Sequence, residues 1–396
     1  MKKEEYIELL KTNRKCNFIA IAITPWHALG INAAIKKLQT LGLELHGYIF
    51  VHAHSLTGYA VNERDFTIDE NIEIKYTHYE NTNIRNKVMT YLSVLFNKKK
   101  KIESSDDIYV VCPETPSWMF VDIVNKAYSN KKTKFIIINE GIASISFKTI
   151  KGLYEKESEV QVAKSGRESN IVFLYIRIIV KLLLERIIEY KEKKNESLLD
   201  WDLFSRKNKE IFINSDIKRY YLETLKEQSA EIDVDAKYNG CILLNPQLLE
   251  QYEGSLIDKD EKPIKCCVDF AKKNGIPIVI KPHPRDRNID RFSSYNCLIE
   301  ENKNLPQELI MAAISEKPLC IISESSTSLI TMNALFGIPS ISYAKISIKE
   351  DIPEYSKQNL NNFIRLFSKT IYMPNDYNEM IEYLENLVRV YEKTQC

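Results

Sequence analysis

Short apolar runs alternate with helical patterns along the first half of the chain. The strand candidates among them are residues 18–23, 45–51, 72–76, 108–112 and 134–138. Near-continuous apolar runs of this length are typical of strands buried on both faces of a parallel sheet. After the first run, Thr24 supplies an N-cap and Pro25 a first helical residue, which predicts a helix that extends through Leu38 and ends near Gly42. This alternation predicts an α/β fold.

The same alternation starts again in the second half. Residues 211–213 have the pattern of the last strand of a first domain, and the polar stretch 228–237 is a linker candidate. New strands are expected at 241–244, 276–280 and 318–322, and a helical pattern at 380–391 closes the chain. With 396 residues the chain exceeds what one hydrophobic core usually fills. We therefore expect two domains, at residues 1–235 and 236–396, with a helical insertion near 165–200 in the first.

Two of these strands end in polar signatures. The strand at 276–280 is followed by Lys281-Pro282-His283-Pro284, and the strand at 318–322 by Ser325, Ser326 and Thr327. Ligands of parallel α/β sheets bind beyond the carboxyl ends of the strands, so two neighbouring strands would bring these signatures to one rim. The prolines restrict the backbone around His283, whose imidazole can donate a hydrogen bond or a proton. The hydroxyls precede a helical pattern that Gly337 ends, and a helix N-terminus is a ready anion site. The layout predicts a phosphate site.

A third polar feature lies between the two signatures. Residues 305–308 read Leu-Pro-Gln-Glu and open another helical pattern. Glu308, in the first turn, can accept hydrogen bonds from the two hydroxyls of a ribose. Phosphate and ribose contacts together predict a nucleotide donor.

Strand ends in the first half supply further candidates. Trp26 and His27 follow the first strand, where they either contact a substrate or serve as a core residue and a helix cap. Glu114 and Ser117 follow the strand at 108–112, where acceptor contact and helix capping explain them equally well. The pair of histidines in the run 52–54 would point to one face, but no third ligand accompanies it, so no metal site is predicted.

Residues 171–190 predict a helix with one charged stripe and an otherwise largely apolar circumference. The stripe consists of Arg177, Lys181, Glu185 and Glu189. These charges interrupt the segment too often for a transmembrane span. The alternatives are burial between the domains, contact with a second subunit as in a homodimer, or docking on a membrane surface. Lys191, Lys193 and Lys194 would add attraction to anionic lipid.

Composition narrows the class of protein. The net charge is +1, from 55 basic and 54 acidic residues, which gives no overall attraction to nucleic acid. The eight cysteines include no CxxC pair and no metal-ligand spacing, so we expect reduced, structural thiols in a cytoplasmic protein. The first residues are polar and lack the apolar core of a signal peptide.

The order of the motifs resembles that of the bacterial sialyltransferases that build lipooligosaccharide and capsule. This group is similar to glycosyltransferase family 52 and is related to the bacterial polysialyltransferases. The matching motifs are Asn139-Glu140-Gly141 after the strand at 134–138, then Lys281-Pro282-His283-Pro284, Pro306-Gln307-Glu308 and Ser325-Ser326. The resemblance implies a GT-B arrangement, in which two Rossmann-like domains face a central cleft, and CMP-sialic acid as the donor substrate with no metal or other cofactor. It also implies that the helix at 380–391 packs back on the first domain.

The resemblance further implies an activity, namely inverting transfer of sialic acid to a galactose-terminated glycan. Such an enzyme works at the cytoplasmic face of the membrane on a lipid-linked acceptor. His283, assisted by Ser325 and Ser326, would neutralise the departing phosphate, and Glu308 would hold the ribose. The remaining donor-binding candidates are Lys281, Pro284 and Thr327. The acceptor-side candidates are Trp26, His27, Glu114, Asn139 and Gly141.

The catalytic base is where the sequence departs from the family. The family places an acidic residue first in its acidic-acidic-Gly motif, whereas this chain has Asn139, whose amide cannot accept a proton at useful pH. Glu140 is the nearest carboxylate and is the predicted base, with His27 and Glu114 as substitutes. Two other functions stay open. One is a GT-B capsule sugar or glycerol-phosphate transferase with a different nucleotide donor, and the other is a catalytically inactive partner that binds nucleotide or glycan.

Overall fold

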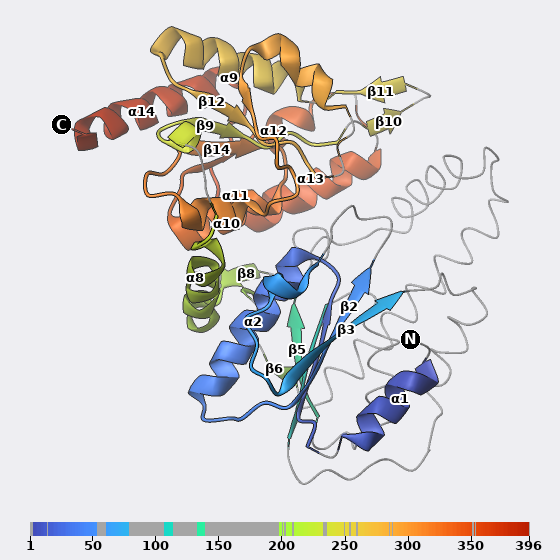
Figure 1. Ribbon diagram of the computed structural model, residues 1–396. Helices are drawn as coiled ribbons and strands as arrows, with labels where there is room; N and C mark the ends of the chain where they lie inside the picture. The colour runs from blue at the N-terminus through green and yellow to red at the C-terminus, as the bar shows by residue number, and fades with distance from the viewer. Residues whose placement is uncertain are drawn as a thin grey trace, which may run out of the picture. The chain divides into compact units, whose positions relative to one another are not determined.

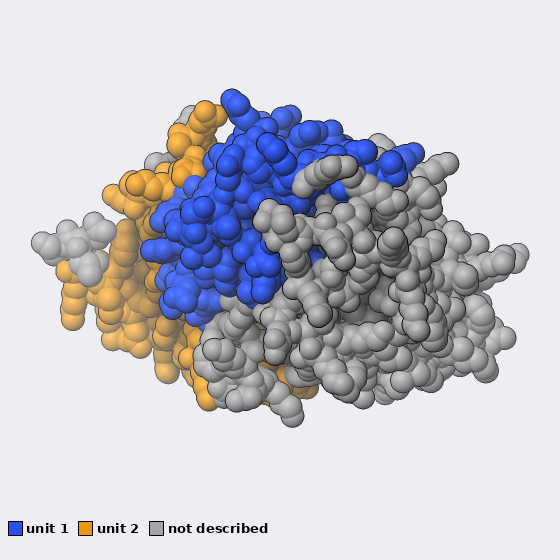
Figure 2. All heavy atoms as spheres, turned by 90° about the horizontal axis from the view of Figure 1, so that it is seen from below, with its two compact units in different colours: residues 1–144, 175–207, 212–224 blue, residues 145–174, 208–211, 225–396 orange. Residues whose placement is uncertain are grey.

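The computed structural model describes the elements that carry most of these motifs. The described residues are 3–13, 15–53, 61–78, 107–113, 133–138, 198–199, 201, 203–207, 210–232, 236–248, 250–252, 255–258, 260–284, 286, 288–350, 352 and 354–395. The chain divides into two compact units (Figure 2). The first comprises residues 1–144, 175–207 and 212–224, and the second comprises 145–174, 208–211 and 225–396. The domain limits 1–235 and 236–396 stay a prediction.

The first unit is built on a six-stranded sheet with the order β3-β2-β1-β4-β5-β6, in which every pairing is parallel (Figure 1). Its strands are β1 (Phe18–Ala22), β2 (Gly47–Ala53), β3 (Ile72–His78), β4 (Ile108–Pro113), β5 (Thr133–Ile138) and β6 (Leu198–Leu199). Among the described residues, the helices that accompany it are α1 (Lys3–Thr12), α2 (Pro25–Thr40) and η1 (Glu63–Asp65). The helix α8 (Ser215–Ser229) begins in this unit, and its residues from 225 onward belong to the second. The first five strands confirm the predicted apolar runs to within two residues at either end.

Alternating residues of β1 face different helices. Ala20 and Ala22 pack in one cluster with α2, and Ile19 and Ile21 pack in another that includes Leu10 of α1. Because successive side chains of a strand point to opposite faces, a strand that is apolar throughout needs cover on both sides. The two clusters provide that cover.

Two features of the predicted domain boundary differ from the simplest expectation. The run at 211–213 does form a strand, β8 (Glu210–Ile213), but β8 pairs with β7 (Phe204–Lys207) in a separate two-stranded sheet. The predicted linker 228–237 begins inside α8, which ends at Ser229. A short helical turn, η3 (Ala236–Tyr238), follows.

The second unit is built on a five-stranded parallel sheet with the order β13-β12-β9-β14-β15. Its strands are β9 (Ile242–Leu244), β12 (Ile278–Ile280), β13 (Leu298–Ile299), β14 (Cys320–Ser323) and β15 (Ser340–Ser342). An antiparallel hairpin of β10 (Glu250–Tyr252) and β11 (Ser255–Ile257) follows β9. The helices are α9 (Glu261–Asn274), η4 (Ile289–Tyr295), α10 (Gln307–Ala313), α11 (Thr327–Phe336), α12 (Ala344–Ser347), α13 (Glu354–Phe367) and α14 (Tyr377–Gln395).

Helices cover both faces of this second sheet. Figure 1 shows α9 and α14 on one side and α10 and α11 on the other. Met380 and Leu384 of α14 are buried in the core cluster that also contains Cys267 of α9. The closing helix, expected to pack back on the first domain, thus contributes to the core of its own unit, because its apolar stripe is buried against this sheet.

The two parallel sheets with their helices confirm the predicted α/β fold class. None of the helices in the described part of the chain has the length and apolar character needed to span a bilayer. The predicted helix at 171–190 and the lysines after it lie outside the described residues.

Candidate functional site

The strand order places the two polar signatures on either side of β9. β12 pairs with β9 on one edge and β14 pairs with β9 on the other, so the prediction that the two signature strands are neighbours was wrong. Local sequence does not encode which strand lies between them. All three strands are parallel and therefore end at the same rim of the sheet. The chain moves outward from β9 to β12 and β13 and then returns to β14, which makes the gap between β9 and β14 a topological switch point.

The segment after β12 folds into a tight turn around His283. The backbone carbonyl of His283 accepts a hydrogen bond from the Asp286 amide at 2.8 Å. The buried Asp286 carboxylate accepts the Asn288 amide at 2.9 Å and faces Arg291 Nη2 at 2.9 Å. His283 itself is partly exposed between Pro282 and Pro284. The turn therefore places His283, a partly exposed residue, at this rim of the sheet.

Lys281 starts this turn but its ammonium group is directed into the unit. Only 7% of the residue is exposed, and Nζ donates to the backbone carbonyl of Lys303 at 3.1 Å. Burial lowers the pKa of Lys281 to about 8, although the nearby carboxylates of Glu300 and Glu308 act in the opposite direction. The described contact connects Lys281 to the Lys303 carbonyl inside the unit, so its contact with a donor substrate stays a prediction.

Glu308 lies in the first turn of α10, as the sequence predicts. Its carboxylate is largely buried and accepts a hydrogen bond at Oε1 from the hydroxyl of Thr331 on α11, at 2.6 Å. None of the described residues donates a hydrogen bond to the second oxygen, Oε2. A carboxylate oxygen fixed in this way can accept hydrogen bonds from ribose hydroxyls.

The hydroxyl signature begins α11. Ser326 is the N-cap and accepts the backbone amide of Ser328 at 3.3 Å. The hydroxyls of Ser326 and Ser328 lie 2.6 Å apart. The helix ends at Gly337, which adopts the left-handed conformation with φ of 69°. The stop is as predicted, and the start lies at Thr327, two residues before the predicted pattern at 329–336. Ser325, Ser326 and Thr327 lie where the positive end of the helix dipole favours an anion.

Asn245, which directly follows β9, was not predicted as a site residue. Its side-chain amide donates to Gln307 Oε1 and, at 2.7 Å, to the hydroxyl of Ser328, while its backbone carbonyl accepts the hydroxyl of Ser323 at 2.6 Å. It thereby connects the starts of α10 and α11 at the switch point. The signal was available: Asn245 is a polar residue directly after a buried strand, the same pattern that selected His283.

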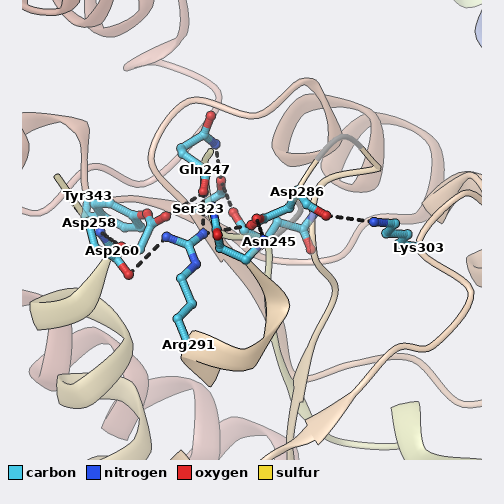
Figure 3. Close-up of polar contacts among 10 residues, drawn as sticks. Asn245, Gln247, Asp258, Asp260, Asp286, Arg291, Lys303, Ser323 and Tyr343 are labelled. Carbon is cyan, nitrogen blue, oxygen red and sulfur yellow. Dashed lines mark hydrogen bonds and ion pairs between the residues drawn. The ribbon is translucent and has the colours of Figure 1, made fainter. Parts of the chain in front are cut away.

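A buried acidic cluster lies next to this region (Figure 3). Asp260 accepts the Gln247 amide at 2.6 Å and a hydrogen bond from the Tyr343 hydroxyl. Burial raises the pKa of Asp260 to about 8, and the charges of Glu324 and Asp258 act in the same direction. Tyr343 and the guanidinium of Arg291 oppose the shift. Burial therefore favours the protonated form of Asp260, which acts as a structural hydrogen-bonding group.

In the first unit, His27 is a buried helix cap. Thr24 and His27 form a capping box at the start of α2, with the backbone amides of Ile23 and Thr24 donating to Nδ1 of His27 at 3.3 and 3.2 Å. Complete burial lowers the pKa of His27 to about 3, so the ring is neutral. Trp26 packs against Phe204, with ring centroids 6.1 Å apart. These contacts match the alternative in which Trp26 is a core residue and His27 a helix cap. Contact of either residue with a substrate stays a prediction.

The remaining candidates of the first half cannot be placed. Glu114, Ser117, His54, Asn139, Glu140 and Gly141 lie outside the described residues. Their strands are described, and β4 and β5 end at Pro113 and Ile138, directly before Glu114 and Asn139. The role of Glu140 as base is therefore a prediction still.

The family follows from the sequence match. The family model of alpha-2,8-polysialyltransferases (POLYST) matches residues 18–345, which include all the motifs described above. The chain belongs to the alpha-2,8-polysialyltransferase family. Membership of this family means that the protein is a sialyltransferase. Its donor substrate is CMP-sialic acid. No curated protein sequence matches the chain.

Solved structures similar to this polysialyltransferase-family protein include glycosyltransferases. An α/β-galactoside α2,3-sialyltransferase from Photobacterium phosphoreum is 13% identical, with 90% of this chain and 97% of that chain covered and a TM-score of 0.38. The GT-B domain of a sialyltransferase from Photobacterium damselae is 12% identical, with 90% and 99% covered and a TM-score of 0.39. The E. coli heptosyltransferase WaaC with ADP is 9% identical, with 93% and 99% covered and a TM-score of 0.39. Because these scores lie below 0.5, they assign neither a substrate nor a residue role to this chain.

Proposed function

We propose that the second unit holds the CMP part of CMP-sialic acid and that the protein transfers the sugar, with inversion, to the end of a capsule or lipooligosaccharide glycan. The observation that carries the proposal is the convergence of the three polar features of this unit. His283 follows β12, Glu308 lies in the first turn of α10, and Ser326 caps the start of α11. These strand and helix ends meet at the carboxyl rim beside the β9 switch point. Such a rim in an open α/β sheet is the usual place for a nucleotide.

The proposed roles follow from the chemistry of sialyl transfer. The bond between sialic acid and the CMP phosphate breaks, and negative charge accumulates on that phosphate as the sugar acquires oxocarbenium character. His283 neutralises this charge by donating a hydrogen bond or a proton, and the start of α11 with Ser325 and Ser326 assists it. Glu308 binds the ribose hydroxyls, and its fixed Oε1 keeps the carboxylate in one orientation. Lys281, Pro284 and Thr327 complete the donor-binding group.

The acceptor hydroxyl must lose a proton when it attacks the sugar. Glu140 is the proposed base, because Asn139 cannot take the proton and Gly141 leaves room for a sugar to approach. Trp26, His27 and Glu114 are the remaining acceptor-side candidates, with His27 and Glu114 as substitutes for the base.

The acceptor is a sialic acid residue, a proposal that the family description favours. An α2,8 linkage joins one sialic acid to the glycerol side chain of another, so the growing end is itself sialylated. A galactose-terminated glycan is the second candidate, favoured by the resemblance of the motifs to the lipooligosaccharide sialyltransferases. In both cases we infer a lipid-linked acceptor at the cytoplasmic face of the membrane, with the segment 171–194 as the contact to lipid or to a second subunit.

The proposal is tested by incubating the protein with CMP-sialic acid and two acceptors, an α2,8-linked oligosialic acid and a lactoside. Mass spectrometry reports which acceptor gains sialic acid. His283→Ala should lower turnover by about 10²- to 10⁴-fold at an unchanged thermal midpoint, the usual worth of general acid catalysis. Glu140→Gln should keep CMP binding and lose transfer. Turnover of His283→Ala near that of the wild type would remove His283 from the mechanism, and transfer to neither acceptor would remove both acceptor candidates.

A further inference from the structure

Arg291 connects segments of the second unit that are far apart in sequence. It lies in η4, and its side chain is 13% exposed. Nη1 lies 2.9 Å from the carboxylate of Asp258, and Nη2 lies 2.9 Å from Asp286 and donates to the backbone carbonyl of Gln247 at 2.7 Å. Figure 3 shows the guanidinium between the end of β9, the segment after β11 and the turn after β12.

The charge balance of this arrangement favours a fixed geometry. A guanidinium removed from water needs compensating charge, and Arg291 forms an ion pair with Asp258 through Nη1 and a hydrogen-bonded ion pair with Asp286 through Nη2. The planar fork of arginine can direct donors at several oxygens at once, which the single ammonium of lysine cannot reproduce. Arg291 also stacks on Phe292, with its guanidinium carbon 4.5 Å from the ring centroid. The side chain is therefore held in one orientation.

A continuous set of hydrogen bonds leads from Arg291 to the start of α11. The Gln247 side-chain amide donates to the Ser323 hydroxyl at 3.0 Å, which donates to the Asn245 carbonyl at 2.6 Å. Asn245 Nδ2 lies 2.7 Å from the Ser328 hydroxyl, which is 2.6 Å from that of Ser326. The end of β9 thus contacts both signatures, because the Leu244 carbonyl also accepts the backbone amide of Lys281 at 2.9 Å.

We propose that Arg291 is a positioning residue that fixes the His283 turn against the end of β9 and so sets the separation of His283 from Ser326. Asp286 is the link, because its amide caps the His283 carbonyl while its carboxylate faces Arg291. The guanidinium is directed at protein oxygens, so it acts through His283 and not on the donor itself. This inference rests on the proposed role of His283 at the donor phosphate.

A double-mutant cycle tests the coupling. The variants are Arg291→Lys, His283→Ala and the two combined, and the measurements are the dissociation constant of CMP by calorimetry, the turnover of CMP-sialic acid and the thermal midpoint. Arg291→Lys should weaken CMP binding by about 10-fold, an effect of the size usual for residues coupled in one network of charged hydrogen bonds. In the His283→Ala background the same substitution should change CMP binding less than 2-fold.

Arg389→Lys is the matched control, because Arg389 is exposed on α14, where it pairs with Glu385 at 3.6 Å. It should leave all three measurements unchanged. Asp286→Asn is the second variant in case Arg291→Lys does not fold, and its effect should likewise vanish in the His283→Ala background.

The outcomes separate this inference from the proposed function. If His283→Ala by itself leaves CMP binding and turnover unchanged, the proposed role of His283 fails and the inference fails with it. If His283→Ala is impaired but Arg291→Lys has the same effect in both backgrounds, or none in either, the proposed function stands and the positioning role is overturned. An effect of Arg291→Lys on the thermal midpoint alone would assign the residue to stability.

Discussion

Thr331→Val removes one hydroxyl group beneath the proposed ribose site and changes the side-chain volume very little. Thr331 is fully buried on α11, and its hydroxyl donates to Glu308 Oε1 at 2.6 Å. The same oxygen lies 3.3 Å from the Ser328 carbonyl and 3.4 Å from the Thr327 carbonyl, but one hydroxyl has a single proton to donate. We assign the proton to the shortest contact, which is to the Glu308 carboxylate. This hydrogen bond is the one that the substitution removes.

The cost follows from the type of bond. A hydrogen bond to a charged group contributes about 1.5–3 kcal/mol, and a neutral one about 0.5–1.5 kcal/mol. Thr331→Val should therefore lower the free energy of unfolding by about 1.5–3 kcal/mol. Thr331→Ser keeps the hydroxyl and loses one buried methyl group, for about 0.8 kcal/mol. In a Glu308→Gln background the acceptor is neutral, so the cost of Thr331→Val should fall by about 1 kcal/mol.

Urea unfolding of the four variants and the wild type, followed by circular dichroism at pH 7, measures these differences, and calorimetry with CMP measures the effect on the site. CMP should bind more weakly to Thr331→Val than to Thr331→Ser, because only the former releases the Glu308 carboxylate. If Thr331→Val proves as stable as Thr331→Ser, or if its cost is the same with and without Glu308→Gln, the hydrogen bond is not what holds Glu308.

Two further predictions concern other parts of the molecule. The pKa of an aspartate in the unfolded chain is near 4, whereas burial raises the pKa of Asp260 to about 8. The contribution of Asp260 to the free energy of unfolding should therefore fall as pH rises between about 4 and 8, by up to about 1.4 kcal/mol per pH unit. Urea midpoints measured across this range should show a shallower slope for Asp260→Asn, and equal slopes would contradict the proton on Asp260. Thr24→Ala removes the N-cap of α2 and should cost about 1 kcal/mol in thermal unfolding, while Thr24→Ser should cost much less. A loss of the same size in both would point to packing of the methyl group instead.

The local elements could be predicted from the sequence because their causes are local. The run at 18–23 is apolar throughout, and the Thr24-Pro25 pair begins α2 with an N-cap and a first-turn proline. Gly337 ends α11 because the left-handed conformation at that position favours glycine. Polar residues after buried strands were selected by the rule for parallel sheets, and that rule gave His283 and Ser326.

The order of the strands and the contacts between distant segments were decided only by the tertiary structure. Nothing in the pattern of single strands states that β9 lies between β12 and β14, because strand pairing depends on long-range packing of faces that are all equally apolar. That order makes Asn245 part of the rim, through a hydrogen bond to Ser328 across 83 positions of sequence. It also brings Gln247 to Arg291 across 44 positions. The complete burial of His27 likewise depends on neighbours from the rest of its unit, because a capping pattern specifies a backbone contact but not what covers it.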